Sequence, residues 1–360
     1  MRIVVAMSGG VDSSVAAALL AEQGHDVIGL SMQLYDQSGG ETTFGSCCTI
    51  DDLHDARRVA SAIGIPHYIV NFERQFDEHV VSNFVREYAA GRTPLPCAHC
   101  NSDLKFAALV ERARGFDADA VATGHYALRD GSDERYLLRR GADRAKDQSY
   151  FLFSLTQDQL AHAVFPVGGW SKDDVRGYAR RRGLPVAGKP DSQEICFIPN
   201  DDYAAFVAAR APGGDRAGVI VDEAGRRVGA HDGIHRFTVG QRKGLNLAVS
   251  TPVPMYVLRL QPADRQVVVG PKSSLERTTL TASGVNWIVK APAAPVRATV
   301  QIRHRHPPAA ATVSVLDSVE ASTHSSRAAV AFDEPQIAVT PGQAVVFYDH
   351  DVVLGGGWID

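Results

Sequence analysis

A run of small and polar residues near the N-terminus has the composition of an anion-binding loop. Residues 8–14 read Ser-Gly-Gly-Val-Asp-Ser-Ser, directly after an apolar, β-branched segment at 2–7 and at the start of a helical pattern over 13–23. A glycine pair lets the backbone turn tightly and approach a phosphate closely, and the free N–H groups at a helix start attract its charge. A glycine turn with Ser and Asp as helix caps is the alternative. The position between strand and helix favours the phosphate loop.

A second glycine-rich run, residues 183–190, imitates a Walker A phosphate loop. It reads Gly-Leu-Pro-Val-Ala-Gly-Lys-Pro, with both glycines and the lysine at the required spacing. However, Pro190 stands where that loop needs a hydroxyl residue for magnesium, and a predicted helix at 172–182 precedes the run instead of a strand. We therefore assign no phosphate site to it.

Five cysteines, at positions 47, 48, 97, 100 and 196, carry the other reactive chemistry. Their odd number, in a chain for which we expect no export signal, argues against a disulfide framework. Cys100 precedes a helix predicted at 102–114, whose dipole would favour the thiolate, the nucleophilic form. Cys196 lies in a loop predicted at 183–199, where function concentrates. An inert buried thiol is the alternative for each cysteine.

The cysteine spacing does not predict a metal site. Cys97 and Cys100 form one CxxC pair, but a structural zinc site needs a second pair. Cys47 and Cys48 are adjacent and have the wrong spacing. We therefore predict that no structural zinc is bound.

Alternating strands and helices must position these residues in the first half of the chain. Their order predicts a doubly wound, parallel α/β sheet. The predicted strands cover 2–7, 27–30, 66–70 and 120–123, and the predicted helices cover 13–23, 51–62, 76–90 and 102–114. After a predicted helix at 202–210, short strand-like runs separated by Pro and Gly predict two small β-rich, barrel-like domains. We expect domains at 1–200, 201–275 and 276–360.

Residue composition and net charge limit the classes of function that the chain can have. The chain has 360 residues, of which 45% are hydrophobic and 22% charged, as in an ordinary globular protein of more than one domain. No apolar stretch approaches the ~18 residues of a membrane helix, so we expect a cytoplasmic protein without membrane contact. Because the net charge is −4, a nucleic-acid partner would be held by local patches. Basic clusters at 172–189, 226–243 and 297–306 fit RNA phosphates or solvated faces.

Several separate segments together carry a specific resemblance. The sequence resembles the bacterial tRNA-specific 2-thiouridylases, which are PP-loop ATP pyrophosphatases, over nearly its whole length. A generic pyrophosphatase of this class would share only the first of the matching segments. These segments are 6–15, 100–101 with 105–106, 122–126, 146–152, 191–197, 237–245 and 341–343.

The resemblance implies a reaction and a nucleotide site. ATP, with Mg²⁺, adenylates the C2 oxygen of the wobble uridine of a tRNA, and persulfide-derived sulfur replaces it, giving 2-thiouridine, AMP and pyrophosphate. The architecture implied is a PP-loop ATPase domain followed by two small β-rich domains. The residues expected to bind the nucleotide are Ala6, Met7, Ser8, Gly9, Gly10, Val11, Asp12, Ser13, Met32 and Gly124.

The resemblance also assigns the sulfur chemistry and the tRNA contacts. Cys196 would carry a persulfide from a donor protein, either a cysteine desulfurase or a relay protein. Cys100 would be the nucleophile and close a Cys100–Cys196 disulfide that is reduced in each cycle. The residues expected to contact tRNA are Leu95, Pro96, Cys97, His125, Lys146, Asp147, Gln148, Arg303, His304 and Gln343.

One segment departs from the common pattern of that family. Many members read Asn-Pro-Asp where this chain reads Leu95-Pro96-Cys97, so a thiol replaces the acid proposed to shuttle a proton. Cys97, Cys100 and Cys196 could instead bind an iron–sulfur cluster. A redox helper thiol and a residue without a role remain the alternatives for Cys97.

Two other functions fit parts of the sequence. An ATP-pyrophosphatase that forms amides from ammonia would explain the phosphate loop, but not the two cysteine motifs or the β-rich domains. A non-catalytic RNA-binding protein with a nucleotide fold would explain the basic clusters, but it leaves both cysteine segments without a purpose.

Overall fold

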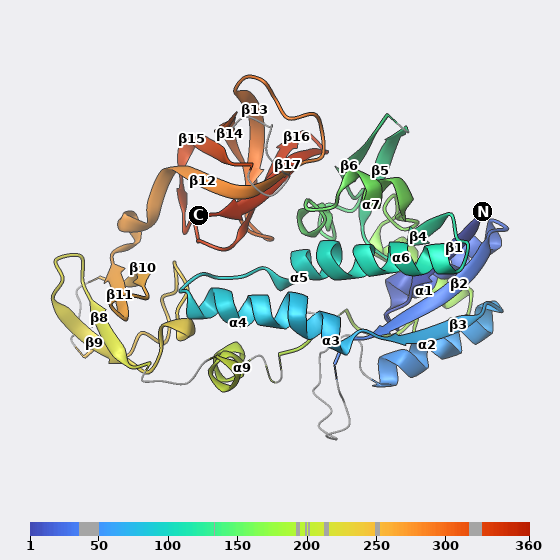
Figure 1. The fold of residues 1–360 in the computed structure, drawn as a ribbon, viewed down its shortest axis with the longest axis horizontal. Helices are drawn as coiled ribbons and strands as arrows, with labels where there is room; N and C mark the ends of the chain where they lie inside the picture. The colour runs from blue at the N-terminus through green and yellow to red at the C-terminus, as the bar shows by residue number, and fades with distance from the viewer. Residues whose placement is uncertain are drawn as a thin grey trace. The chain divides into compact units, whose positions relative to one another are not determined.

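The computed structural model describes most of the chain, and these residues form two compact units (Figure 1). The first unit holds residues 1–81, 96–201 and 351–353, and the second holds 82–95, 202–350 and 354–360. The described residues are 1–35, 50–132, 134–191, 195–198, 200, 202–211, 216–248, 253–316 and 326–360.

A parallel sheet of order β3-β2-β1-β4-β7 forms the centre of the first unit. Its strands are β1 (Arg2–Ala6), β2 (Asp26–Gln33), β3 (His67–Asn71), β4 (Ala120–Ala122) and β7 (Ala163–Val164). Val4 of β1 pairs with Ile28 of β2 on one side and with Val121 of β4 on the other. β1 is therefore an inner strand, which agrees with its continuous apolar run.

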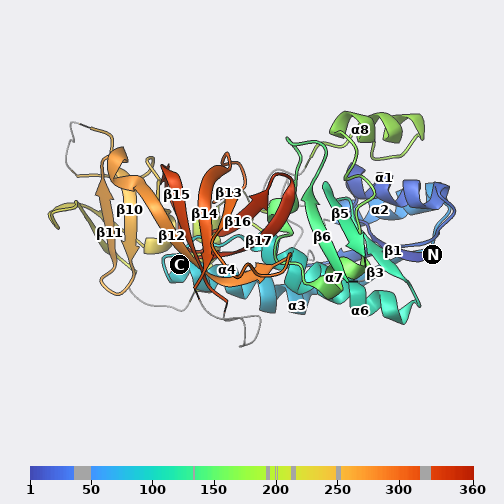
Figure 2. The same ribbon diagram turned by 90° about the horizontal axis from the view of Figure 1, so that it is seen from above.

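Helices cover both faces of this sheet, as Figure 2 shows. Because side chains alternate along a strand, Ile3, Val5 and Met7 point to one face, where they pack with buried residues of α1, α2 and α8. α6 contacts β1 and β4 as well. The predicted doubly wound α/β sheet is confirmed. The helices are α1 (Val11–Glu22), α2 (Ile50–Ile63), α3 (Glu73–Phe76), α5 (Pro96–His99), α6 (Ala107–Gly115), α7 (Gln157–His162) and α8 (Lys172–Arg181).

Three features of the first unit differ from the sequence-based prediction. A hairpin of β5 (Ala127–Ser132) and β6 (Arg135–Arg140) follows β4 and was not predicted. The helix expected at 76–90 is interrupted by a π-helical stretch, η1 (Asp77–Val81). The helix expected to begin after Cys100 starts earlier, at Pro96, and contains a second π-helical stretch, η2 (Cys100–Phe106). A 3₁₀ turn, η3 (Ser149–Phe151), completes the unit.

The second unit contains two β structures, as the sequence predicted. The smaller sheet has the order β10-β11-β8-β9 and encloses a core that includes Ile220, Val257 and Val267. Six strands of the larger sheet have the order β12-β15-β14-β13-β16-β17, and they close into a barrel because β12 also pairs with β17. Val300, Val313 and Phe347 are fully buried inside that barrel.

Most strands of the second unit are short, and β12 and β15 are the longest of those described, with 12 and 10 residues. They are β8 (Gly218–Val221), β9 (Arg227–His231), β10 (Tyr256–Gln261), β11 (Gln266–Gly270), β12 (Glu276–Trp287), β13 (Val296–Gln301), β14 (Ala309–Val315), β15 (Ala328–Ile337), β16 (Ala344–Asp349) and β17 (Val352–Ile359). The 3₁₀ turns η5 (Ile234–Arg236) and η6 (Lys272–Leu275) connect strands. Helices α4 (Ser82–Ala89) and α9 (Tyr203–Arg210) pack together through stacked rings of Tyr88 and Tyr203, 4.8 Å apart.

None of the described helices has both the length and the apolar composition that crossing a bilayer requires.

Candidate functional site

The predicted phosphate loop lies where the strand order of the parallel sheet reverses. It follows β1 and opens α1, with β2 on one side of β1 and β4 on the other. The carboxyl ends of strands at such a switch point form the usual ligand crevice of open α/β sheets. Topology therefore places the loop where a nucleotide can reach the backbone N–H groups of the first turn of α1.

The two glycines of this loop are required for different reasons. Gly9 has φ +72°, and a Cβ there would clash with the carbonyl oxygen of Asp52 at the start of α2. Gly10, the N-cap of α1, is extended, and a Cβ there would meet only Ser8 Oγ, at 3.5 Å. The backbone of the protein thus demands glycine at position 9. At position 10 the open space fits the close approach of a ligand.

Hydroxyl groups hold the loop in shape without covering the helix start. The Ser14 hydroxyl donates to Gly10 O at 2.8 Å, and the Ser8 N–H donates to Ser13 Oγ at 3.2 Å. Because the N-cap residue is a glycine, it has no side chain to accept from the first-turn N–H groups. The N–H groups of the first turn can therefore donate to an anion, so the residues present fit the polyphosphate of a nucleotide.

The other predicted nucleotide-binding residues lie at the same edge of the sheet. Gly124 follows β4, and a Cβ on it would lie 2.5 Å from the backbone nitrogen of Ser13. Met32 is buried near the end of β2, where the adjacent Ser31 hydroxyl donates to Met7 O at 2.6 Å. The structure therefore brings residues 6–13, Met32 and Gly124 together.

A buried lysine connects the loop to the segment that leads to Cys196. Lys172 Nζ, on the first residue of α8, contacts both carboxylate oxygens of Asp12, at 2.8 and 2.9 Å. The same ammonium lies 2.8 Å from Asp191 Oδ1. Tyr126 donates its hydroxyl to Asp12 at 2.8 Å. Sequence reasoning missed this contact because 160 residues separate Lys172 from Asp12.

Asp191 accepts from three cations and remains ionised. Lys146 Nζ lies 2.7 Å and Arg176 Nη2 3.0 Å from its oxygens, in addition to Lys172. Burial alone would raise the pKa of Asp191, but the hydrogen bonds from these three groups lower it well below its usual value. Asp191 therefore binds the three cations as a carboxylate, five residues before Cys196.

The basic cluster at 172–189 consists largely of internal ion pairs. Lys172 and Arg176 contact Asp191, Arg182 contacts Glu22, and Lys189 contacts Asp52 and Asp55 of α2. The acids come from distant parts of the sequence, so the sequence around the cluster did not reveal the carboxylates that pair with it. Lys172, Arg176 and Lys189 therefore bind acids within the first unit, whereas Arg180 and Arg181 are exposed.

Cys100 lies inside a helical run and not at its start. The run begins at Pro96, and proline favours the first helical position because it lacks an N–H. The thiol is buried, with 6% of the residue exposed, in the π-helical stretch η2. Such stretches are frequent at functional sites. The prediction of a helix beginning after Cys100 is therefore wrong, and Pro96 was the signal for the true start.

The segments that carry Cys196 and Cys100 contact the same short elements of the first unit. The half-buried Cys196 precedes Phe197, whose ring meets the ring of Phe76 in α3 edge to face at 5.4 Å. Both α3 and η1 contact η2, which starts at Cys100. Residues 192–194 lie outside the described residues.

The described cysteines do not form a metal site. Across the parts of the chain that the structure describes, no three His, Cys, Asp or Glu side chains gather closely enough to hold a metal ion. Cys97 is exposed on α5, whereas Cys100 is buried. These residues do not fit an iron–sulfur cluster as they are placed. Cys47 and Cys48 lie outside the described residues.

Predicted tRNA-contacting residues of the first unit differ in how available they are. Pro96 is buried, while Lys146 is partly exposed beside Asp191. Asp147 accepts from the N–H groups of Gly141 and Ser149, both at 3.0 Å. Gln148 accepts from the Tyr126 N–H at 2.9 Å. Asp147 and Gln148 therefore hold their own loop, next to the phosphate loop.

His125 is held as a neutral ring. Its Nδ1 lies 2.8 Å from Thr123 Oγ1, and its ring lies 6.3 and 6.4 Å from those of Phe106 and Phe165. Burial, together with the charge of Lys105, lowers the pKa of His125 to about 3. A neutral imidazole can stack on a base or accept a hydrogen bond, but it offers no charge to a phosphate.

The second unit holds the remaining predicted tRNA contacts. Gln343 donates to the carbonyl oxygens of Thr93 and Pro94, at 3.0 and 3.2 Å, just before the half-buried Leu95. Arg303 and His304 are exposed on a turn after β13, and Gln301 donates to both of their carbonyl oxygens.

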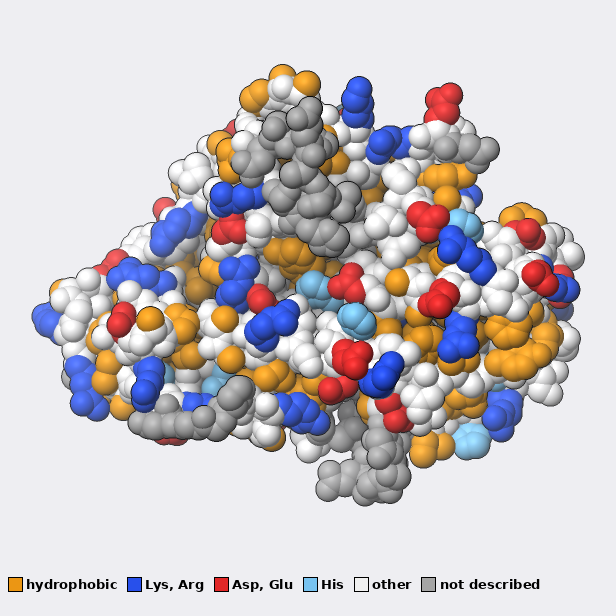
Figure 3. All heavy atoms as spheres, in the orientation of Figure 1, with side chains coloured by type: hydrophobic (Ala, Val, Ile, Leu, Met, Phe, Trp, Pro, Cys, Tyr) orange, Lys and Arg blue, Asp and Glu red, His pale blue; other side chains and the backbone are white. Residues whose placement is uncertain are grey.

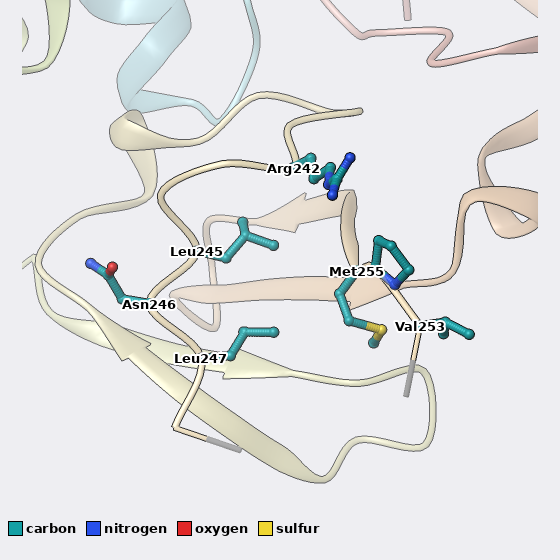
Figure 4. Close-up of a pocket in the computed structure, with 7 residues that line it drawn as sticks. Arg242, Leu245, Asn246, Leu247, Val253 and Met255 are labelled. Atoms are coloured by element: carbon teal, nitrogen blue, oxygen red, sulfur yellow. The ribbon is translucent and has the colours of Figure 1, made fainter. Parts of the chain in front are cut away.

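The surface and the pocket of the second unit show where ligands could bind outside the phosphate loop. On the face drawn in Figure 3, Lys and Arg side chains lie interspersed with Asp and Glu, which agrees with the many ion pairs. The pocket in Figure 4 belongs to the second unit and contains none of the predicted site residues. Its lining residues are Arg242, Leu245, Asn246, Leu247, Val253, Pro254 and Met255.

The lowered pKa of His125 predicts a loss of stability in acid. Below its ordinary pKa of 6.5, the unfolded chain binds a proton at this residue and the folded chain does not. The contribution of His125 is therefore complete above pH 6.5 and is lost as the pH falls towards 3. Between pH 7.5 and 5.5, the free energy of unfolding measured in urea should fall by about 1 kcal/mol more for the parent than for His125→Gln. Equal losses would contradict the neutral state of the half-buried His125 ring.

Sequence comparisons match every domain of the chain. The family described as tRNA methyl transferase HUP domain matches residues 1–200, tRNA methyl transferase PRC-barrel domain matches 205–271, and Aminomethyltransferase beta-barrel domain matches 277–359. A tRNA-specific 2-thiouridylase MnmA of Geobacter metallireducens is 53% identical over 100% of this chain and 96% of its own. Proteins of the same name from Geotalea uraniireducens (51%; 100% and 95%) and Solibacter usitatus (53%; 99% and 99%) are similar.

Proposed function

Because this chain belongs to the tRNA-specific 2-thiouridylase family, we propose that it is an ATP-dependent tRNA sulfurtransferase that converts a wobble uridine to 2-thiouridine. The observation that supports this most is the phosphate loop at the switch point, in the same unit as two cysteine segments packed on shared helices. A phosphate loop serves activation by ATP, and paired thiols serve sulfur transfer.

The first half of the proposed reaction makes a leaving group. The C2 oxygen of uridine attacks the α-phosphorus of ATP, the bond to the β-phosphate oxygen breaks, and pyrophosphate leaves. The N–H groups after Gly10 would hold the pyrophosphate, and Gly124 and Met32 would face the rest of the nucleotide. Mg²⁺ would accompany ATP and offset its charge.

The second half moves sulfur and leaves a disulfide. The terminal sulfur of a Cys196 persulfide attacks C2, and AMP departs with the former C2 oxygen. The Cys100 thiolate then attacks Cys196 Sγ, the persulfide S–S bond breaks, and the bonding electrons stay on the sulfur of 2-thiouridine. A Cys100–Cys196 disulfide forms, and a thiol reductant restores both thiols.

The partners follow from this chemistry. A cysteine desulfurase or a relay protein would deliver the persulfide, in a cytoplasm that keeps thiols reduced. The tRNA would be contacted by Leu95 to Cys97, His125, Lys146 to Gln148, Arg303-His304 and Gln343. We keep the domain limits 1–200, 201–275 and 276–360, which the family matches support.

The experiment that tests the function measures AMP and pyrophosphate release with and without tRNA, together with nucleoside analysis of the tRNA. We expect both products and 2-thiouridine only when tRNA and a persulfide donor are present. An ammonia-dependent ligase would release AMP without thiolating tRNA, and a non-catalytic RNA-binding protein would release neither product.

The sulfur chemistry of Cys100 and Cys196 should be separable from the binding of ATP and tRNA. We expect Cys100→Ser and Cys196→Ser each to abolish thiolation while ATP and tRNA affinities stay at the parental value, because a hydroxyl is a far poorer sulfur nucleophile. Mass spectrometry of the digested tRNA measures the yield. Cys47→Ser and Cys48→Ser are the controls and should thiolate like the parent. Parental yield from either Cys100→Ser or Cys196→Ser contradicts the relay.

Gly10 should be a binding residue that the fold does not need. The extended backbone and open space at position 10 accept a branched side chain, so Gly10→Val should fold normally. Its methyl groups would occupy the space of the pyrophosphate and weaken ATP binding at least tenfold by calorimetry. Gly9→Ala is the contrasting variant and should reduce the unfolding temperature. Parental ATP affinity in a folded Gly10→Val protein would refute the loop assignment.

Affinity for tRNA should fall steeply with salt, because each phosphate contact releases a counterion, with a log–log slope of about −0.7 to −0.9 per contact. Arg303 is exposed, so Arg303→Ala should reduce the affinity and remove about one contact from the slope. Arg297→Ala is the matched control, because Arg297 is held by both oxygens of Asp333. Equal effects of the two variants, or an affinity independent of salt, would exclude a specific contact at Arg303.

A further inference from the structure

Lys189, the lysine of the run that imitates a Walker A loop, reaches the true phosphate loop. Its Nζ donates to the carbonyl oxygen of Gly9 at 3.1 Å. The same ammonium contacts Asp52 at 2.5 Å and Asp55 at 2.6 Å, both on α2. None of the steps of the proposed reaction uses this lysine.

The contact determines which way one peptide group faces. In a trans peptide the C=O of one residue and the N–H of the next point in opposite directions, and none of the described peptide bonds is cis. With Gly9 O held toward Lys189 and α2, the Gly10 N–H faces away from them. The space around Gly10 is open, with Ser8 Oγ as the nearest group to a Cβ. The peptide therefore presents a donor, not an acceptor, to an incoming phosphate.

A Gly–Gly peptide needs such a restraint. Neither residue has a Cβ that would limit rotation, so the alternative orientation, with the carbonyl facing the ligand, is open to it. A carbonyl oxygen there would repel a phosphate. Lys189 can hold the oxygen because it stays charged: burial would lower its pKa, but the hydrogen bonds to Asp52 and Asp55 raise it.

We propose that Lys189 is a positioning residue that fixes the Gly9–Gly10 peptide with its N–H toward the pyrophosphate of bound ATP. This inference rests on the proposed function for its ligand. A purely structural lysine, which only joins the loop after α8 to α2, is the competing explanation.

The test removes the donor without leaving an unpaired buried acid. In the double variant Lys189→Met with Asp52→Asn, one positive and one negative charge disappear together, and Asp55 keeps its contact with Arg58. Calorimetry with pyrophosphate, ATP and AMP gives the readout. We expect affinities for pyrophosphate and ATP to fall about tenfold, the usual size for a lost charge-assisted hydrogen bond, while the affinity for AMP stays within twofold.

Two further variants sharpen the result. Lys189→Arg keeps a cationic donor and should recover most of the pyrophosphate affinity. Arg58→Gln removes another partner of Asp55 that does not contact Gly9, and it should bind all three ligands like the parent. Unchanged pyrophosphate affinity in the double variant, or equal losses for AMP and pyrophosphate, overturns the inference. A parent that binds neither ATP nor pyrophosphate overturns the proposed function as well.

Discussion

The sharing of one ammonium between Asp12 and Asp191 is the constraint on which the site depends. Lys172 lies at the start of α8, where Ser171 and Asp174 form a capping box, so the lysine is fixed at its backbone as well as at its side chain. Its two acids belong to the phosphate loop and to the segment that leads to Cys196. Removing the carboxylate of Asp12 or of Asp191 would leave the partly buried Lys172 ammonium with one acid fewer to balance its charge. One electrostatic link therefore joins the phosphate loop to the segment that leads to Cys196.

Sheet topology explains why the link is possible. The loop after β1 and Gly124 after β4 meet at the switch point, and α8 contacts α1 on the same face of the sheet. α1 contributes Asp12 from its first turn, and α8 contributes Lys172 from its first residue. Both groups lie at helix N-termini, which concentrate positive potential. A polyphosphate in this crevice would meet several N–H donors that need no rearrangement.

Sequence patterns predicted the features that form between residues close together in the chain. They failed for contacts between residues far apart in the sequence and for strands with few buried residues. The phosphate loop was predictable because strand, glycine pair and helix lie within residues 2–23. Lys172 and Lys189 were assigned to a basic surface because their partners, Asp12 and Asp52, are far away in sequence. The β5–β6 hairpin was missed because Leu138 is its one fully buried residue on β6, so apolar alternation is faint. The helix start was predicted too late, after Cys100, because Pro96 was not used as the signal for the first helical turn.

The charge balance around the loop sets what a nucleotide must bring with it. Five basic groups (Lys146, Lys172, Arg176, Lys189 and Arg58) face four carboxylates (Asp12, Asp52, Asp55 and Asp191), which leaves little net positive charge. Attraction for a polyphosphate must then come from backbone N–H groups, the α1 dipole and a cation carried by the nucleotide. Neutral N–H donors select by position and not by charge. A loop of this kind depends on the orientation of its peptides, so one lysine that holds a carbonyl away from the ligand can matter more than several that lie near it.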